Sequence, residues 1–119
     1  MKTKLLGREG EARAAQHLRK NGYNIIGMNY KTRFGEIDLI AEDKKYIVFV
    51  EVKLRKNARF AEAREFVDLR KIERIKTTAE IWLSQNETDK PVRFDVIEIY
   101  FSEGGTEKEK IIHLEDAFQ

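Results

Sequence analysis

The chain has 119 residues, of which 41% are hydrophobic and 37% are charged, with no cysteine and a formal net charge of +2. This composition predicts one globular domain over residues 1–119 and excludes disulfide frameworks, thiolate nucleophiles and cysteine-based zinc sites. No apolar run is long enough to span a bilayer, and the N-terminal segment lacks the apolar core of a secretory signal, so a cytoplasmic location is expected.

The first half of the chain predicts one helix followed by three strands. Strong helix formers fill residues 8–21, and Gly22 is a suitable C-terminal stop. Apolar segments then alternate with turns at residues 32–35 and 42–45. The third apolar segment is too hydrophobic for an edge strand, which indicates burial on both faces. The three predicted strands are residues 23–30, 36–41 and 46–53.

The second half predicts another helix and two more strands. Residues 64–85 carry apolar side chains at spacings of three and four, after a basic loop at residues 54–63. The only proline, Pro91, ends the segment that breaks this helix. Strands are predicted at residues 92–101 and 110–115, around a polar turn. The apolar stripe of the helix, expected in the core, is Phe66, Leu69, Ile72, Ile75, Ala79, Trp82 and Leu83.

The resulting element order is α-β-β-β-α-β-β. This order excludes the regular alternation of strands and helices in a doubly wound nucleotide-binding fold. The glycine-rich dinucleotide and Walker-type phosphate motifs are also absent from the sequence. We therefore predict an α/β fold in which helices flank a mixed β-sheet.

Asp38, Glu51 and Lys53 lie among the Ile, Leu, Val and Phe residues of the most apolar segment, GEIDLIAEDKKYIVFVEVKLR at residues 35–55. Alternation places Glu51 and Lys53 on one face of the third strand, about 6–7 Å apart. Two of the tight turns that this segment allows pair Asp38 with Phe49 or with Glu51, and either register brings Asp38 to the same face. A slip of one residue would place Asp38 on the opposite face.

Two neighbouring carboxylates at the end of a sheet are costly to bury unless a cation compensates them. Mg²⁺ prefers such hard oxygen ligands, so Asp38 and Glu51 predict a Mg²⁺ or Mn²⁺ site. Lys53 would then orient or deprotonate an attacking water, or stabilise charge that develops on a phosphate. This set predicts metal-assisted phosphodiester hydrolysis. A structural ion pair at the rim of the sheet is the alternative that the spacing leaves open.

The first helix offers a third acid to this site. Glu11, Ala15 and Leu18 follow i, i+4, i+7 spacing, so Glu11 lies on the stripe that packs against the sheet. An acid on that stripe needs a partner, which the site at Asp38 and Glu51 would provide. The alternative is a carboxylate at the solvent edge of a wide stripe.

A basic block occupies the middle of the chain. Residues 53–76 contain nine Lys or Arg and four Asp or Glu. Such a patch can bind phosphate backbones, although a solvated helix face would have the same composition.

The remaining polar candidates are interpreted as structural. His17 is expected on the polar side of the first helix and His113 in the last strand. Two histidines so far apart predict neither a zinc site nor a Ser-His-Asp triad. Asp95 is interpreted as a surface acid at the start of a strand, with support of the site as the alternative.

Four motifs together resemble the uncharacterised YraN-type bacterial family. They are Gly7-x-x-Gly10-Glu11-x-x-Ala14, GEIDLIA, FVEVKLR, and RFDV following a helix that contains Lys71. The family is similar to the restriction-endonuclease-like superfamily of PD-(D/E)XK nucleases, in particular its Holliday-junction-resolvase-like branch. The resemblance covers residues from about 7 to 100 and implies a restriction-endonuclease-like fold. It also implies metal-dependent cleavage of DNA, including branched or damaged DNA.

The resemblance assigns roles to residues of this chain. Ile37 rather than proline precedes Asp38, a departure that leaves the acid intact. A homodimer is expected only by analogy with junction-cutting relatives. The alternatives are a nucleic-acid-binding or adaptor module that keeps the fold without cutting, and a protein-interaction domain. The implied sites are the metal ligands Asp38, Glu51 and Glu11, the catalytic lysine Lys53, and the nucleic-acid contacts Arg55, Lys56 and Lys71.

Overall fold

A computed structural model of the chain describes residues 2–55, 68–100 and 110–119. None of the described helices has the length and apolar character needed to cross a membrane. The elements are helix α1 (Lys2–Lys20), strands β1 (Asn24–Thr32), β2 (Gly35–Glu42) and β3 (Ile47–Arg55), helix α3 (Leu69–Gln85), and strands β4 (Val92–Tyr100) and β5 (Lys110–Leu114).

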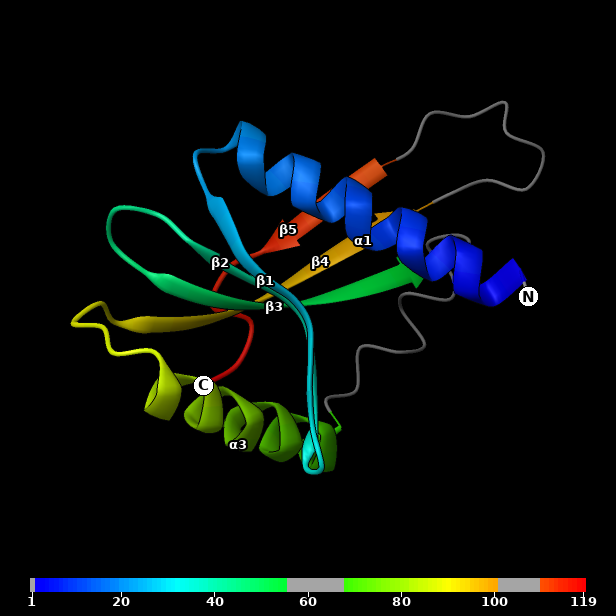
Figure 1. The fold of residues 1–119 in the computed structure, drawn as a ribbon. Coiled ribbons are helices and arrows are strands. Elements are labelled where there is room, and N and C mark those ends of the chain that lie inside the picture. The colour runs from blue at the N-terminus through cyan, green and yellow to red at the C-terminus, as the bar shows by residue number, and fades with distance from the viewer. Residues whose placement is uncertain (1, 56–67, 101–109) are drawn as a thin grey trace.

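The five strands form one mixed sheet in the order β1-β2-β3-β4-β5. Strands β3 and β4 are parallel, and the other neighbouring pairs are antiparallel. Helix α3 lies on the crossover that a parallel pair requires. Helices α1 and α3 cover opposite faces of the sheet (Figure 1). This architecture and element order confirm the predicted α/β, restriction-endonuclease-like fold.

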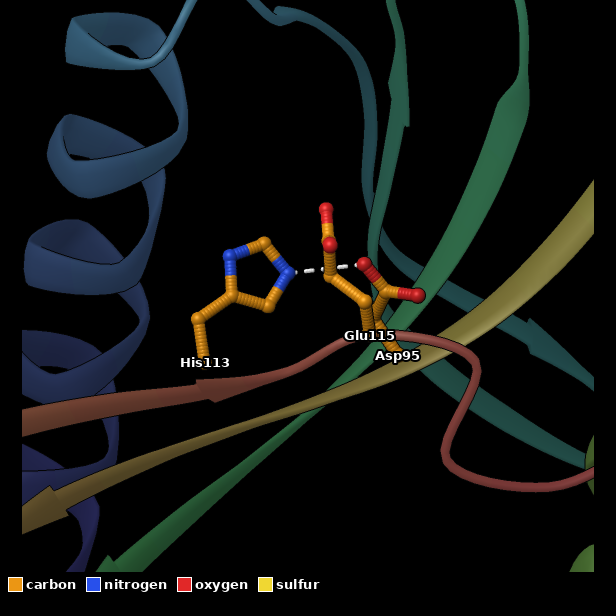
Figure 2. A group of neighbouring side chains, drawn as sticks. All are labelled: Asp95, His113 and Glu115. Atoms are coloured by element: carbon orange, nitrogen blue, oxygen red, sulfur yellow. Dashed lines mark hydrogen bonds and ion pairs between the residues drawn. The ribbon is translucent and has the colours of Figure 1, made fainter.

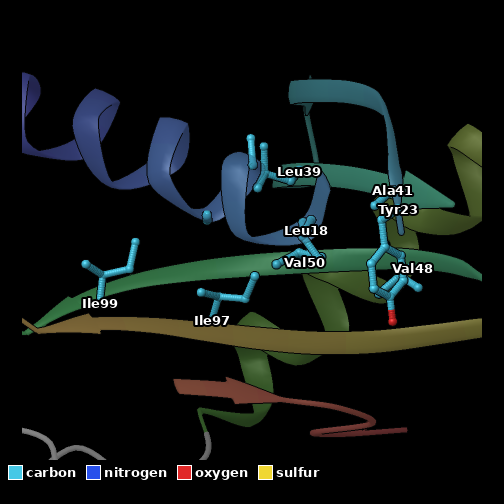
Figure 3. Close-up of a cluster of buried hydrophobic side chains, with 10 residues drawn as sticks. Leu18, Tyr23, Leu39, Ala41, Val48, Val50, Ile97 and Ile99 are labelled. Atoms are coloured by element: carbon cyan, nitrogen blue, oxygen red, sulfur yellow. The ribbon is translucent and has the colours of Figure 1, made fainter. Parts of the chain in front are cut away.

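Both faces of the central strands are buried. Between α1 and the sheet, Leu18 packs with Val50, Ile97 and their neighbours (Figure 3). Between α3 and the sheet, Phe49 packs edge-on against Trp82, with ring centroids 5.7 Å apart. Alternate residues of β3 therefore enter separate clusters, as its apolar sequence predicted.

Helix α3 begins at a side-chain cap. The carboxylate of Asp68 accepts hydrogen bonds from the backbone N–H groups of Arg70 and Lys71, at 3.0 and 3.3 Å. Of the predicted apolar stripe, Ile75, Ala79 and Trp82 are buried, as the spacing predicted. Leu69 was wrongly predicted to lie in the core, because the first turn of α3 leaves its side chain 72% exposed. Phe66 and most of the predicted basic loop lie outside the described residues.

A two-residue turn at Lys44 and Lys45 fixes the register between β2 and β3. Asp43 donates its backbone N–H to the carbonyl of Tyr46 at 3.1 Å, and its side chain accepts the N–H groups of Lys45 and Tyr46. The last described pair of this ladder is Leu39 with Val50. Of the two registers predicted for this hairpin, the structure has the one that directs Asp38 toward Glu51.

Candidate active site

The regular pairing of strand β2 stops at Asp38. Beyond Leu39 and Val50, the Oδ2 atom of Asp38 accepts the backbone N–H of Val52 at 2.8 Å. A side-chain carboxylate therefore satisfies a strand N–H that would otherwise need a backbone carbonyl. The strands part at this position, and the Asp38 carboxylate is held between them by its own hydrogen bond.

Asn29 marks the corresponding irregularity on strand β1. Its φ of 51° lies in the left-handed region, where asparagine is one of the few tolerated residues. The pairing of β1 with β2 passes over Asn29 and Asp38. The Nδ2 group of Asn29 donates to the Oε1 atom of Glu11 at 3.1 Å, which links this irregularity to helix α1.

Gly10 allows helix α1 to approach strand β3 closely. A Cβ atom added at Gly10 would collide with the side chain of Leu54. The missing side chain therefore lets the helix lie near the sheet at the turn that carries Glu11. Glu11 itself is partly buried, in agreement with its predicted place on the packing stripe.

Three of the predicted acids, Asp38, Glu11 and Glu51, interact electrostatically. Burial raises the pKa of Asp38 to about 6 against the opposing effect of the Val52 N–H, and the charges of Glu11, Glu51 and Glu36 also raise it. Glu11 and Glu51 therefore lie near enough to make the charged form of Asp38 unfavourable. A carboxylate in these surroundings is neutralised either by a proton or by a nearby cation.

Lys71 supplies part of this compensation. Its ammonium group forms an ion pair with the Oε1 atom of Glu51. The side chain of Glu51 is only 12% exposed, whereas that of Lys71 is 58% exposed. The pair joins strand β3 to the beginning of helix α3, with its positive partner toward solvent.

A cleft of about 600 Å³ opens between strands β2 and β3 and the first turns of α3. Asp38 and Glu51 lie on its strand side. Arg70, Lys71 and Arg74, all exposed, lie on its helix side. The cleft therefore has carboxylates on its strand side and cationic side chains on its helix side.

The other predicted site residues lie in different surroundings. Lys53 is partly buried on β3, two residues beyond Glu51 and opposite Glu98 of β4, and it does not line the cleft. Arg55 is buried, and its Nε and Nη2 groups donate to Oε2 of Glu98 at 3.1 and 3.0 Å. This buried ion pair leaves the guanidinium of Arg55 inaccessible to a phosphate, in contrast to its expected role. Lys56 lies outside the described residues.

Asp95 is the centre of a second polar cluster, and its interpretation as a surface acid was wrong. Its side chain is fully buried and accepts Nε and Nη2 of Arg93 at 2.9 and 2.8 Å. Nε2 of His113 and the backbone N–H of Asp116 donate to it at 2.7 and 3.0 Å. Burial alone would raise the pKa of Asp95, but these hydrogen bonds hold it below its usual value. Arg93 and Asp95 are two residues apart on β4 and so share one face, a spacing from which the pair could have been predicted.

Asp95, His113 and Glu115 lie close together (Figure 2). Within the described ranges, they form the one group of three potential ligands whose ligand atoms all lie within 4.8 Å of one another. However, Nη2 of Arg93 already contacts Asp95 at 2.8 Å and Glu115 at 3.3 Å. The guanidinium therefore occupies the position that a cation would take, and we interpret this cluster as structural.

His17 extends the cluster to helix α1. Its Nε2 atom lies 3.2 Å from Nδ1 of His113, so the two histidines expected to be far apart are in contact. Burial lowers the pKa of His17, and the nearby His113 and Lys20 lower it further. The contacts from Asp95 through His113 to His17 therefore connect helix α1 to strands β4 and β5.

Comparisons with known proteins agree with the resemblance seen in the motifs. Residues 10–99 match the model of a family described as "Uncharacterised protein family UPF0102". A UPF0102 protein of Syntrophomonas wolfei is 45% identical over 114 residues, which cover 95% of this chain and 96% of the relative. One from Caldicellulosiruptor bescii is 44% identical over 120 residues, covering 99% and 100%. A third, from Vibrio parahaemolyticus, is 46% identical over 99 residues, or 82% of each chain. The chain therefore belongs to the UPF0102 family.

Proposed function

We propose that the protein is a metal-dependent nuclease of the PD-(D/E)XK type that hydrolyses phosphodiester bonds in DNA. The observation that carries this proposal is the environment of Asp38. Its carboxylate lies at the edge of a cleft, and burial, with the charges of Glu11 and Glu51, raises its pKa to about 6. Strongly perturbed acids in clefts are typical of catalytic and metal-binding sites.

The donor set fits a hard divalent cation. Asp38 and Glu51 would hold Mg²⁺ or Mn²⁺ through carboxylate oxygens, and Glu11 would complete the site from helix α1. The negative charge that these acids concentrate is what such a cation would neutralise. When bound, it would polarise the phosphate and lower the pKa of a coordinated water.

The basic groups of the chain have complementary roles in this proposal. Arg70, Lys71 and Arg74 would bind the phosphates of the DNA from the helix side of the cleft. Within the described part of the chain, Lys53 has no hydrogen-bond or ion-pair partner. Lys53 follows Glu51 by two residues on β3 and does not line the cleft, so its amine would have to turn toward the bound metal to orient the attacking water or to stabilise the charge that develops on the phosphate.

The alternative, a DNA-binding module that does not cut, also has one observation in its favour. Lys71 already neutralises Glu51, so the acidic cluster is partly compensated without a metal. Calorimetric titration with Mn²⁺ separates the two functions. If the protein is a nuclease, Mn²⁺ should bind the wild type, and binding should be lost in Glu51→Gln. Binding should be retained in Asp89→Asn, because Asp89 is an exposed acid that does not line the cleft. Absence of Mn²⁺ binding to the wild type would favour the module.

A further inference from the structure

The tip of the β1–β2 hairpin presents an aromatic ring and a guanidinium group together. Phe34 is 42% exposed, and the guanidinium carbon of Arg33 lies 4.8 Å from the centroid of its ring. Both residues lie at the turn, where neither side chain is needed to fill the core. The pair forms a small cationic and aromatic surface.

This tip is braced against helix α3. Thr32 accepts the backbone N–H of Phe34 at 3.1 Å, and its hydroxyl lies 3.3 Å from that of Thr78 on α3. A Cβ atom at Gly35 would lie 3.1 Å from Cβ of Arg74, so the turn and the helix touch. The hairpin reaches across to the beginning of α3 (Figure 1). The tip is therefore held in a defined position.

The same hairpin leads directly into the candidate active site. Gly35 and Glu36 line the cleft, next to the tip. Phe34 precedes Asp38 by four residues on the strand, which corresponds to about 13 Å. Successive nucleotides rise about 3.4 Å along the axis of a duplex and extend further in an unpaired strand, so the tip lies within about four nucleotide steps of Asp38.

We propose that Arg33 and Phe34 form a stacking platform for an unpaired base, so that the protein selects DNA in which unpaired bases adjoin a duplex. This inference rests on the proposed function, because it assumes that the DNA backbone follows the cleft. Aromatic rings and guanidinium planes both stack on exposed bases, whichever the base. A closed duplex keeps its bases in the helical stack and offers none to the platform.

Binding experiments without turnover test this platform. Fluorescence anisotropy in EDTA compares a splayed-arm DNA with a fully paired duplex of the same length. Phe34→Ala should weaken binding of the splayed DNA about tenfold and leave duplex binding unchanged, whereas Phe34→Trp should preserve both. The matched control is Met28→Ala, which removes an exposed apolar side chain within β1, away from the turn.

A 2-aminopurine base at the unpaired position reports stacking directly. The wild type should quench its fluorescence, and Phe34→Ala should not. Equal effects of Phe34→Ala on both DNAs, no effect on either, or no DNA binding by the wild type would overturn the platform. Selective binding of splayed DNA without cleavage would support the stacking platform and contradict the proposed nuclease function. Cleavage that is lost in Asp38→Asn but unchanged in Phe34→Ala would support the nuclease function and contradict the platform.

Discussion

Lys71 of helix α3 forms an ion pair with Glu51 of strand β3 at the edge of the cleft. The carboxylate is largely buried and the amine largely exposed, so the amine is the partner with open solvent to move into. A cation that binds Glu51 from solvent must compete with Lys71. We expect Lys71 to act as a counterion in the metal-free protein and as a phosphate ligand once a metal displaces it.

Lys71→Met should therefore raise the affinity for Mn²⁺ and lower the affinity for DNA. An ion pair with one exposed partner contributes about 0.2–1 kcal/mol, so the gain in Mn²⁺ affinity should be no more than about fivefold. Calorimetry measures the metal and anisotropy measures the DNA. Lys76→Met, on the same helix but outside the cleft, should change neither. A loss of Mn²⁺ affinity in Lys71→Met would show that Lys71 supports the metal site instead of competing with it.

The raised pKa of Asp38 predicts a pH-dependent cost to stability in metal-free buffer. Because this pKa is about 6 in the folded protein against a usual 3.8, the folded chain binds more protons than the unfolded chain between about pH 4 and 6. Stability is therefore lost as the pH rises through this window. Asp38→Asn should be more stable than the wild type by about 2–3 kcal/mol above pH 7 and nearly equal to it below pH 4.

Urea unfolding at both ends of this window measures the difference. Asp89→Asn, which changes an exposed acid and keeps Asp38, serves as the control, and its stability should follow that of the wild type at both pH values. Saturating Mn²⁺ should stabilise the wild type and not Asp38→Asn. If Asp38→Asn were more stable than the wild type by the same free energy at pH 4 and pH 7, the raised pKa of Asp38 would be contradicted.

The cluster at Asp95 should prove structural. Asp95→Ala leaves the guanidinium of Arg93 without its buried partner and should cost about 3–5 kcal/mol of unfolding free energy. Glu115→Ala removes an exposed contact of the same guanidinium and should cost about 1 kcal/mol or less. Urea unfolding measures both. Similar large losses in the two variants, together with destabilisation by EDTA, would instead indicate a cation held by Asp95, His113 and Glu115.

The local part of the site could be predicted from the sequence. The alternation of β3 and the short turn before it placed Glu51 and Asp38 together, because strand period and turn length fix the register of a hairpin. Helical spacing likewise placed Glu11 on the packing face of α1. Each of these inferences depends on residues close together in the chain.

The remaining contacts depend on how distant elements meet. The parallel register of β3 and β4 allows Glu98 to pair with Arg55, and the sequence gives no turn that would reveal this register. The contact of His17 with His113 spans 96 positions and requires the observed placement of α1 over the sheet. The left-handed backbone of Asn29, which presents its amide to Glu11, has no distinct sequence signal of its own.

The most direct test of the central claim is a cleavage assay with purified protein in Mn²⁺. Supercoiled, linear, single-stranded and four-way-junction DNA are compared for the wild type, Asp38→Asn, Glu51→Gln and the control Asp89→Asn. We predict that the wild type and Asp89→Asn cleave at least one of these DNAs and that the other two variants lose about 100-fold or more of this activity. No cleavage of any DNA by the wild type, or undiminished cleavage by Asp38→Asn and Glu51→Gln, would contradict the proposed nuclease site.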